Sequence, residues 1–170
     1  MYVNLGRQSQ NIILRISLGG EVTDYPNKAE GGCFCGNIRF EVAVGPDYVA
    51  YCHCKSCRKS TGAPAVVYVT YQQKDVIFTK GKRKKFASSE GVSRTFCKDC
   101  GTPISYEAEW NGNNVIGFFV GTMDEPDFFP AQKHVAHRER LTWFDASDNL
   151  PRFLEFPRKD QVPDSKNPAV

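Results

Sequence analysis

Apolar and polar residues alternate most clearly over residues 37–44. Apolar side chains occupy every second position there, and polar or charged side chains fill most of the positions between them. A period of two places the apolar residues on one face, so this stretch predicts a half-buried β-strand. Enrichment in β-branched and aromatic residues predicts two more strands, over residues 66–71 and 76–79.

A hairpin is predicted around Asn111-Gly112, a dipeptide typical of tight turns between strands. Its strands are expected over residues 104–107 and 115–120, joined by a loop of more than two residues. No stretch shows the period of a long amphipathic helix, and no segment of 20–50 residues repeats. The pattern weakens after about residue 124, where mostly irregular chain is expected. The prediction is one mainly β domain.

The two ends of the chain differ from this pattern. Residues 1–30 show little periodicity and are expected to form a loosely held extension, with one short strand around residues 12–16 and a turn at 25–28. The ordered domain is expected over residues 31–157. Residues 158–170 are polar and contain prolines, which predicts a disordered tail.

Composition narrows the class of protein. A length of 170 residues suits one domain, and 41% hydrophobic with 24% charged residues is ordinary for a soluble globular protein. A net charge of +3 is too small to indicate nucleic-acid binding by itself. No stretch approaches the roughly 18 consecutive apolar residues of a membrane span. Arg15 interrupts the apolar patch near the N-terminus and no cleavage site follows, so a cytoplasmic location is expected.

Seven cysteines provide the candidate chemistry. An odd number in close C-x-C and C-x-x-C spacings favours metal ligands over a disulfide framework. In each outer pair, glycine follows the second cysteine: Cys33-x-Cys35-Gly36 and Cys97-x-x-Cys100-Gly101. Glycine allows the tight backbone of a zinc knuckle, and two facing knuckles would complete a tetrahedral site of four thiolates. Ordinary buried cysteines, or a redox dithiol at Cys97 and Cys100, are the alternatives.

The central cysteines, Cys52, Cys54 and Cys57, lack that glycine signature. The first two share a face of an extended segment, and the last two share a face of a helical turn, so all three thiolates can converge on one ion. Three protein ligands leave a tetrahedral zinc with an open position, which is the catalytic arrangement. The alternative is a second structural zinc completed by His53 or another residue. We expect His53 to point the other way, outside the ligand set or on the surface.

Cations surround this triplet. Lys55, Arg58 and Lys59 would help to keep the thiolates ionised and could hold an anionic ligand, although solvated surface residues have the same pattern. The basic run over residues 80–85 is expected to be a solvated hairpin or a further anion contact. His134 and His137 are three residues apart, and we expect structural histidines there rather than metal ligands.

These motifs resemble the glutathione-dependent formaldehyde-activating family, also called the CENP-V/GFA domain. The resemblance lies in Gly32-Cys33-x-Cys35-Gly36, Cys52-His53-Cys54-x-x-Cys57-Arg58-Lys59 and Phe96-Cys97-x-x-Cys100-Gly101. The later similar segments are Gly121-Thr122-Met123-Asp124, His134, Trp143-Phe144 and Leu150-Pro151-Arg152-Phe153. The similarity covers about residues 31–156.

The resemblance implies a β-tent fold of small antiparallel sheets with two zinc sites. The structural site would use Cys33, Cys35, Cys97 and Cys100. The labile site would use Cys52, Cys54 and Cys57. The family's named activity is a carbon–sulfur lyase reaction in reverse, which joins formaldehyde to glutathione. The glutathione carboxylates would then need cations such as Arg58 and Lys59, and family position suggests Asp124 or His134 as a general acid.

Other functions fit the same scaffold. A zinc-stabilised module could bind glutathione, protein or nucleic acid without catalysis, because fold alone does not determine function. The run over residues 80–85 would then contact an acidic partner. Nucleic acid is not expected, because no further basic clusters with interleaved aromatic residues occur. A homo-oligomer is compatible with the sequence.

Overall fold

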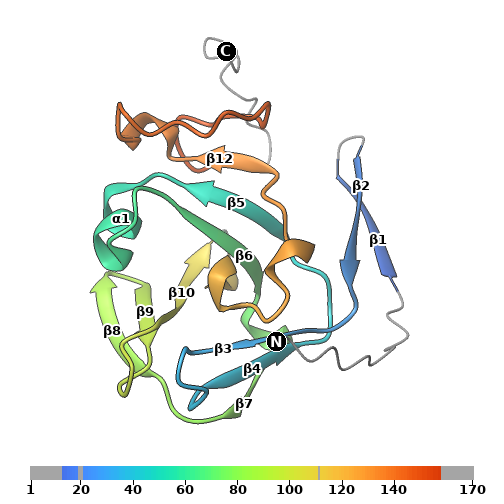
Figure 1. The fold of residues 1–170 in the computed structure, drawn as a ribbon, viewed down its shortest axis with the longest axis vertical. Coiled ribbons are helices and arrows are strands. Elements are labelled where there is room, and N and C mark those ends of the chain that lie inside the picture. The colour runs from blue at the N-terminus through green and yellow to red at the C-terminus, as the bar shows by residue number, and fades with distance from the viewer. Residues whose placement is uncertain (1–12, 19–20, 111, 158–170) are drawn as a thin grey trace, which may run out of the picture.

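Strands make up most of the protein. The computed structural model describes residues 13–18, 21–110 and 112–157, with side chains described from Tyr25 onward. Its largest unit is a seven-stranded sheet in the order β12-β5-β6-β11-β10-β9-β8 (Figure 1). The strands of this sheet are β5 (Tyr48–Cys52), β6 (Val66–Gln72), β8 (Lys84–Ser89), β9 (Val92–Phe96), β10 (Pro103–Trp110), β11 (Asn113–Phe119) and β12 (Lys133–Val135).

Two smaller sheets complete the fold. One contains β3 (Ala29–Gly32), β4 (Arg39–Val42) and β7 (Val76–Lys80), and the other pairs β1 (Ile13–Leu18) with β2 (Glu21–Pro26). Neighbouring strands are antiparallel, except that β12 is parallel to β5. The mainly β fold of small antiparallel sheets is thus confirmed.

Helical segments are short. The α-helix of the described residues, α1 (Lys55–Thr61), follows β5 and lies beside the tip of β8 in Figure 1. Four 3-10 turns connect other elements: η1 (Gln73–Asp75), η2 (Val120–Thr122), η3 (Pro126–Phe128) and η4 (His137–Glu139). Among the described segments, no helix has the length and apolar character needed to cross a membrane.

The main core lies between the three-stranded and seven-stranded sheets. Phe40 of β4 stacks on Phe118 of β11 with ring centroids 3.8 Å apart, and both are almost fully buried. Tyr25 is also buried and stacks on Phe129 at 6.1 Å. The expected N-terminal extension thus contributes a core residue at its end. The expectation for residues 1–12, and that of a disordered tail at 158–170, lies outside the described residues.

Several predicted strands are present. The expected strands at 37–44, 66–71 and 76–79 are β4, β6 and β7, and the strand near residues 12–16 is β1. The predicted hairpin is β10 and β11. Trp110 pairs with Asn113, so the connection consists of two residues, and the expectation of a longer loop was wrong. Gly112 has a φ of 76°, as a tight hairpin turn of this kind requires.

Six strands were not predicted: β2, β3, β5, β8, β9 and β12. All six positions of β8 are exposed, because it is an edge strand rich in lysine, a common protection against edge pairing. The sequence of β8 is therefore mostly polar and lacks the apolar alternation that predicts a strand. β12 has three residues and forms through a parallel pairing with a distant segment, which leaves no local periodicity.

Candidate metal centres and active site

The outer cysteine pairs lie in two matching turns, between β3 and β4 and between β9 and β10. The Gly36 amide donates to the Cys33 carbonyl at 2.9 Å, and the Gly101 amide donates to the Cys97 carbonyl at the same distance. These glycines have φ values of 72° and 74°, a left-handed conformation that side chains disfavour. The Ile38 amide donates to the Cys33 sulfur at 3.2 Å. Both turns are therefore shaped as knuckles around their sulfurs.

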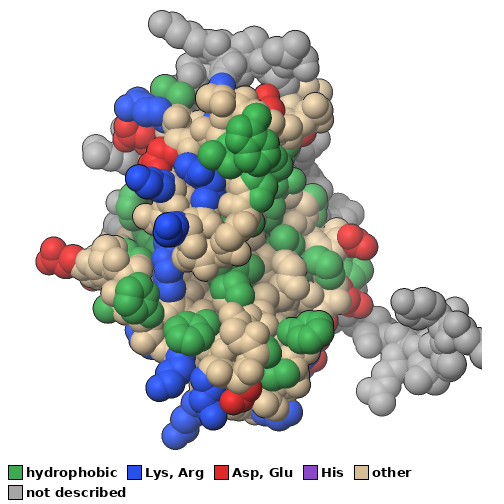
Figure 2. Space-filling view, turned by 60° about the vertical axis from the view of Figure 1, so that its left-hand side comes forward, with side chains coloured by type: hydrophobic (Ala, Val, Ile, Leu, Met, Phe, Trp, Pro, Cys, Tyr) green, Lys and Arg blue, Asp and Glu red, His purple; other side chains and the backbone are tan. Residues whose placement is uncertain are grey.

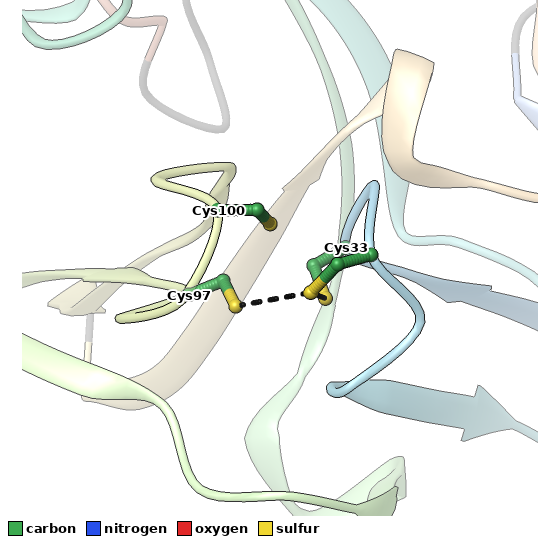
Figure 3. A group of neighbouring side chains, drawn as sticks. Cys33, Cys97 and Cys100 are labelled. Atoms are coloured by element: carbon green, nitrogen blue, oxygen red, sulfur yellow. Dashed lines mark hydrogen bonds between the residues drawn. The ribbon is translucent and has the colours of Figure 1, made fainter.

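The four sulfurs converge. Cys33 and Cys35 have their sulfurs 3.5 Å apart, and Cys35 and Cys97 have theirs 3.8 Å apart. The sulfurs of these three residues and of Cys100 all lie within 4.8 Å of one another, and Figure 3 shows Cys33 facing Cys97 and Cys100 from the other side. Zinc–sulfur bonds of about 2.3 Å in a tetrahedron separate sulfurs by about 3.8 Å. The cluster therefore fits zinc, and an ion there would link the three-stranded sheet to the seven-stranded sheet.

One of these donors, Cys100, has a thiol that suits a cation. The Thr102 hydroxyl and backbone amide hydrogen-bond to Cys100 and lower the pKa of its thiol to about 6. The hydroxyl oxygen lies 3.1 Å from the sulfur. A thiol of low pKa is ionised at neutral pH, which is the state that binds a metal.

The central triplet lies where β5 passes into α1. Cys52 is the last residue of β5, Cys54 caps the N-terminus of α1, and Cys57 lies in its first turn. The Cys57 amide donates to the Cys54 sulfur at 3.3 Å. All three sulfurs lie within 4.8 Å of one another. The change from extended to helical backbone thus brings the three sulfurs together, and their separation allows a shared zinc ion.

Two further residues contact the Cys57 sulfur. The Tyr68 hydroxyl donates to it at 3.5 Å, and Arg94 Nη2 lies 3.6 Å away. Arg94 Nη1 also donates to the Tyr68 oxygen at 3.3 Å. Hydrogen bonds from Cys52 and Cys54, together with those from Tyr68 and Arg94, lower the pKa of Cys57 to about 2. Neither residue is predicted from the sequence, because strand pairing brings them to the triplet and no motif spacing marks them.

A groove of about 650 Å³ lies beside the triplet, between α1 and the strands β8–β10. Three cations line it: Lys55 and Lys59 on α1, and Arg94 on β9. Phe86 and Phe96 contribute apolar surface. Figure 2 shows this side of the molecule, where Lys and Arg side chains gather with apolar side chains between them. The groove therefore combines positive charge with access to Arg94, which contacts a candidate ligand sulfur.

Residues 28–139 match the family model described as glutathione-dependent formaldehyde-activating enzyme. The chain belongs to this family. The resemblance inferred from the cysteine motifs is therefore confirmed. An uncharacterized lyase of Schizosaccharomyces pombe (strain 972 / ATCC 24843) is 34% identical over 85 residues. That alignment covers 50% of this chain and 61% of the lyase, less than two thirds of its length.

A solved structure is also similar. It is the crystal structure of a Rhodobacter sphaeroides protein determined as a Northeast Structural Genomics target. It shares 22% sequence identity with this chain, and the TM-score is 0.46. The match covers 56% of this chain and 87% of the other.

Arg58 and Lys59, both expected to hold an anionic ligand, differ from each other in what they contact. The Arg58 guanidinium donates to the backbone carbonyls of His53 and Glu139, both at 3.0 Å. It thereby joins α1 to η4. Lys59 lines the groove. Of the two, Lys59 is therefore the better placed to meet an anionic ligand, with Lys55 and Arg94 beside the same space.

All three histidines of the chain meet in one buried cluster. His134 Nε2 lies 3.1 Å from the Asp148 carboxylate, and His134 Nδ1 lies 2.8 Å from His53 Nε2. If His134 donates to Asp148, its Nδ1 accepts from His53. Burial lowers the pKa of all three imidazoles, to about 4 for His53 and His137. The surface position considered for His53 was wrong.

The remaining candidates lie in ion pairs. Asp124, considered as a general acid, pairs with Arg39 of β4. In the basic run, Arg83 Nη1 and Lys85 Nζ lie 2.6 and 3.2 Å from the buried carboxylate of Glu107. That carboxylate neutralises part of the run, which weakens its interpretation as an open nucleic-acid contact.

Proposed function

We propose that this protein catalyses the reversible addition of a small thiol of the glutathione class to an aldehyde. In this reaction the thiol sulfur forms a bond to the aldehyde carbon. The carbonyl π bond opens, and its oxygen takes up a proton. The reverse reaction is a carbon–sulfur lyase step. The observation that carries the proposal is the convergence of Cys52, Cys54 and Cys57 beside a cationic groove.

The donor set supports zinc at both cysteine clusters. Thiolates are ligands that zinc prefers, and the four-cysteine cluster has the sulfur separations of a closed structural site. At the triplet, a bound zinc ion would supply an open position and the Lewis acidity that favours the thiolate form of a fourth sulfur ligand.

The groove supports an anionic thiol. Its volume of about 650 Å³ is in the usual range for small-molecule sites. Glutathione carries two carboxylates, and Lys55, Lys59 and Arg94 offer three cations within the groove. Arg94 also contacts the Cys57 sulfur. A carboxylate held by these residues would therefore orient the thiol sulfur towards the triplet.

Tyr68 supports the addition step. Its side chain is buried, and burial raises its pKa well above the ordinary value, so the hydroxyl remains protonated. The residue lines a small cavity that also borders Cys52 and Cys57. The single hydroxyl proton is donated to the Cys57 sulfur in this structure, so it would turn from that sulfur to donate to an aldehyde oxygen as negative charge develops on it.

The test is catalysis of adduct exchange by the full zinc-loaded chain. Glutathione and ¹³C-formaldehyde are mixed, and exchange between free and thiol-bound carbon is followed by NMR. We expect exchange faster than the uncatalysed rate. The double substitution of Lys55→Ala and Lys59→Ala should raise KM for glutathione about tenfold.

2-Mercaptoethanol, which has no carboxylate, is the matched thiol. Its KM should change little in the double variant. Absence of acceleration with either thiol would overturn the proposal. Glutathione binding without acceleration would instead favour the binding-module alternative.

A further inference from the structure

Two adjoining cavities lie on the side of the triplet formed by β5, β6, β11 and β12. The inner one, of about 40 Å³, is bordered by Cys52, Cys57 and Tyr68. The outer one, of about 110 Å³, is bordered by Trp110, Lys133 and Pro157, which do not line the inner one. The two share five lining residues: Tyr48, Tyr106, Val115, Val135 and Phe156. They therefore adjoin and form a passage that leads to two of the three candidate zinc ligands.

The passage is separate from the cationic groove. Arg94 lines the groove, Tyr68 lines the inner cavity, and both contact the Cys57 sulfur. The two side chains are hydrogen-bonded to each other at 3.3 Å. The Cys57 sulfur is thus approached from two spaces, and the Arg94–Tyr68 pair lies between them. This arrangement suits a reaction that joins two different molecules.

The walls of the passage are mainly aromatic and aliphatic. Phe156 packs against Trp110 with ring centroids 6.0 Å apart, at the outer end of the passage. The ammonium group of Lys133 lies 4.4 Å from the centre of the Tyr48 ring, so an aromatic face already engages its charge. An apolar group would therefore meet suitable partners along this passage.

The size of the passage exceeds what a one-carbon aldehyde needs. A molecule of two heavy atoms is similar in size to water, whose share of liquid volume is about 30 Å³, so the inner cavity would suffice. An apolar cavity of about 150 Å³ can bind benzene. The outer cavity of about 110 Å³ and the inner cavity of about 40 Å³ together reach about this volume, so the passage as a whole offers space for a ring.

We infer that the passage binds the apolar substituent of the aldehyde, so that the preferred carbonyl substrate carries a group of about phenyl size. This inference rests on the proposed function. The thiol sulfur would approach from the groove and form the bond to the carbonyl carbon in the inner cavity. The carbonyl oxygen would accept a hydrogen bond from Tyr68 and take the proton released by the thiol. No oxidant or reductant is needed.

Binding is tested without chemistry by titrating the full zinc-loaded chain with benzyl alcohol, which has the shape of benzaldehyde but no carbonyl. The readout is the perturbation of side-chain NMR signals of Trp110 and Val115. We expect saturable binding to the native chain. Val115→Phe, at a partly exposed position, should fill the passage and weaken binding at least tenfold. Ile77→Phe adds the same ring on exposed β7 and is the matched control.

Turnover is then compared with glutathione and either benzaldehyde or formaldehyde. In Lys133→Trp, which adds bulk to the outer cavity alone, we expect kcat/KM to fall at least tenfold for benzaldehyde and to change less than about twofold for formaldehyde, because pocket contacts of this size discriminate by 10-fold or more. Pro157→Trp is the second variant that fills only the outer cavity, in case the first folds poorly.

The outcomes separate the two claims. Formaldehyde acceleration with no benzyl alcohol binding overturns the inference and leaves the proposed function standing. Benzyl alcohol binding that Val115→Phe abolishes, with no acceleration of any aldehyde, supports the cavity assignment and overturns the proposed function. Equal loss of both activities in Lys133→Trp also overturns the inference.

Discussion

Arg94 and Cys57 connect the cationic groove to the candidate metal centre. Arg94 Nη2 lies 3.6 Å from the Cys57 sulfur, although the two residues belong to β9 and α1. The guanidinium carbon lies 5.4 Å from the centre of the Tyr106 ring, and Arg94 pairs with Tyr106 across the two strands. The aromatic contact and the hydrogen bond to Tyr68 hold the cation in place. Arg94 is therefore positioned to act on both the sulfur and a ligand in the groove.

Replacing Arg94 should impair thiol use while leaving the metal bound. Arg94→Met removes a charge-assisted hydrogen bond of about 1.5–3 kcal/mol, which corresponds to a loss of about 10–100-fold in kcat/KM for glutathione. Arg94→Lys should recover only part of the lost kcat/KM, because an ammonium group cannot bridge Tyr68 and Cys57 as the planar guanidinium group does. Kinetics with glutathione and zinc analysis of the same samples provide the measurement.

Lys84→Met, on neighbouring β8, is the control for loss of one positive charge. Lys84 does not line the groove, so kcat/KM for glutathione in Lys84→Met should remain close to the native value. Loss of one zinc ion in Arg94→Met would contradict the assignment and would show that Arg94 retains the metal instead.

The two cysteine clusters should differ in what their loss does to the protein. Cys97→Ser removes one sulfur from the cysteine cluster between the two larger sheets, where a bound zinc ion would link them, and structural zinc contributes about 10–16 kcal/mol of apparent binding free energy in small domains. We therefore expect this variant to lose cooperative thermal unfolding. Cys57→Ser should remain folded, retain one zinc ion and lose activity. Elemental analysis and calorimetry of both variants provide the test.

Native protein is the reference for this comparison and should contain two zinc ions per chain. Added glutathione or a weak chelator should remove one of them first. An equal loss of both ions, or a folded Cys97→Ser variant with one ion, would refute the division into a structural and a labile site.

Local patterns were sufficient to predict β4, β6, β7 and the β10–β11 hairpin. Their side chains alternate or are rich in β-branched residues, and a turn dipeptide marks the hairpin. The outer cysteine cluster was equally accessible, since Cys33-x-Cys35 and Cys97-x-x-Cys100 carry their spacing and glycines within a few residues. Such features depend on neighbours in the chain, which the sequence displays directly.

The surroundings of the sites could not be predicted in this way. Tyr68 and Arg94 reach Cys57 through the pairing of β6 and β9 within the large sheet, and nothing in their local sequence indicates that contact. His134 meets His53 because β12 lies parallel to β5, with His134 opposite Tyr51. Contacts of this kind depend on strand order and register, which a single sequence does not show.

The Glu107 carboxylate should stabilise the fold through its ion pairs with Arg83 and Lys85. It is buried on β10, and Arg83 Nη1 lies 2.6 Å from one of its oxygens. Glu107→Gln leaves Arg83 and Lys85 without a countercharge, and breaking a buried pair is costly, although Lys85 is largely exposed. We expect a loss of about 2 kcal/mol, or about 4–8 °C in Tm.

Glu109→Gln is the matched control, because it makes the same change at an exposed position of the same strand. Thermal unfolding should distinguish the two variants by several degrees. Equal Tm values would contradict the stabilising role and would restore residues 80–85 as a free basic patch.

The histidine cluster should make the fold less stable as pH falls from about 6.5 to about 4. Burial lowers the pKa of His137 to about 4, and both of its ring nitrogens are buried without a hydrogen-bond partner. The unfolded chain therefore binds a proton at higher pH than the folded chain does. Unfolding free energy then rises with pH across this window, and the contribution is lost as pH falls through it. For His137 alone we expect the unfolding free energy to fall by roughly 2 kcal/mol between the two ends of this pH window.

His137→Phe keeps a ring in the cluster and removes its titration. Its unfolding free energy should depend less steeply on pH between 4 and 6.5, with a difference in slope approaching one proton. Denaturant unfolding at several pH values measures this slope. Arg138→Gln, at the exposed neighbouring position, leaves the three histidines in place and should keep the native slope. An unchanged slope in His137→Phe would show that His137 is already protonated in the folded protein, against the burial that its position indicates.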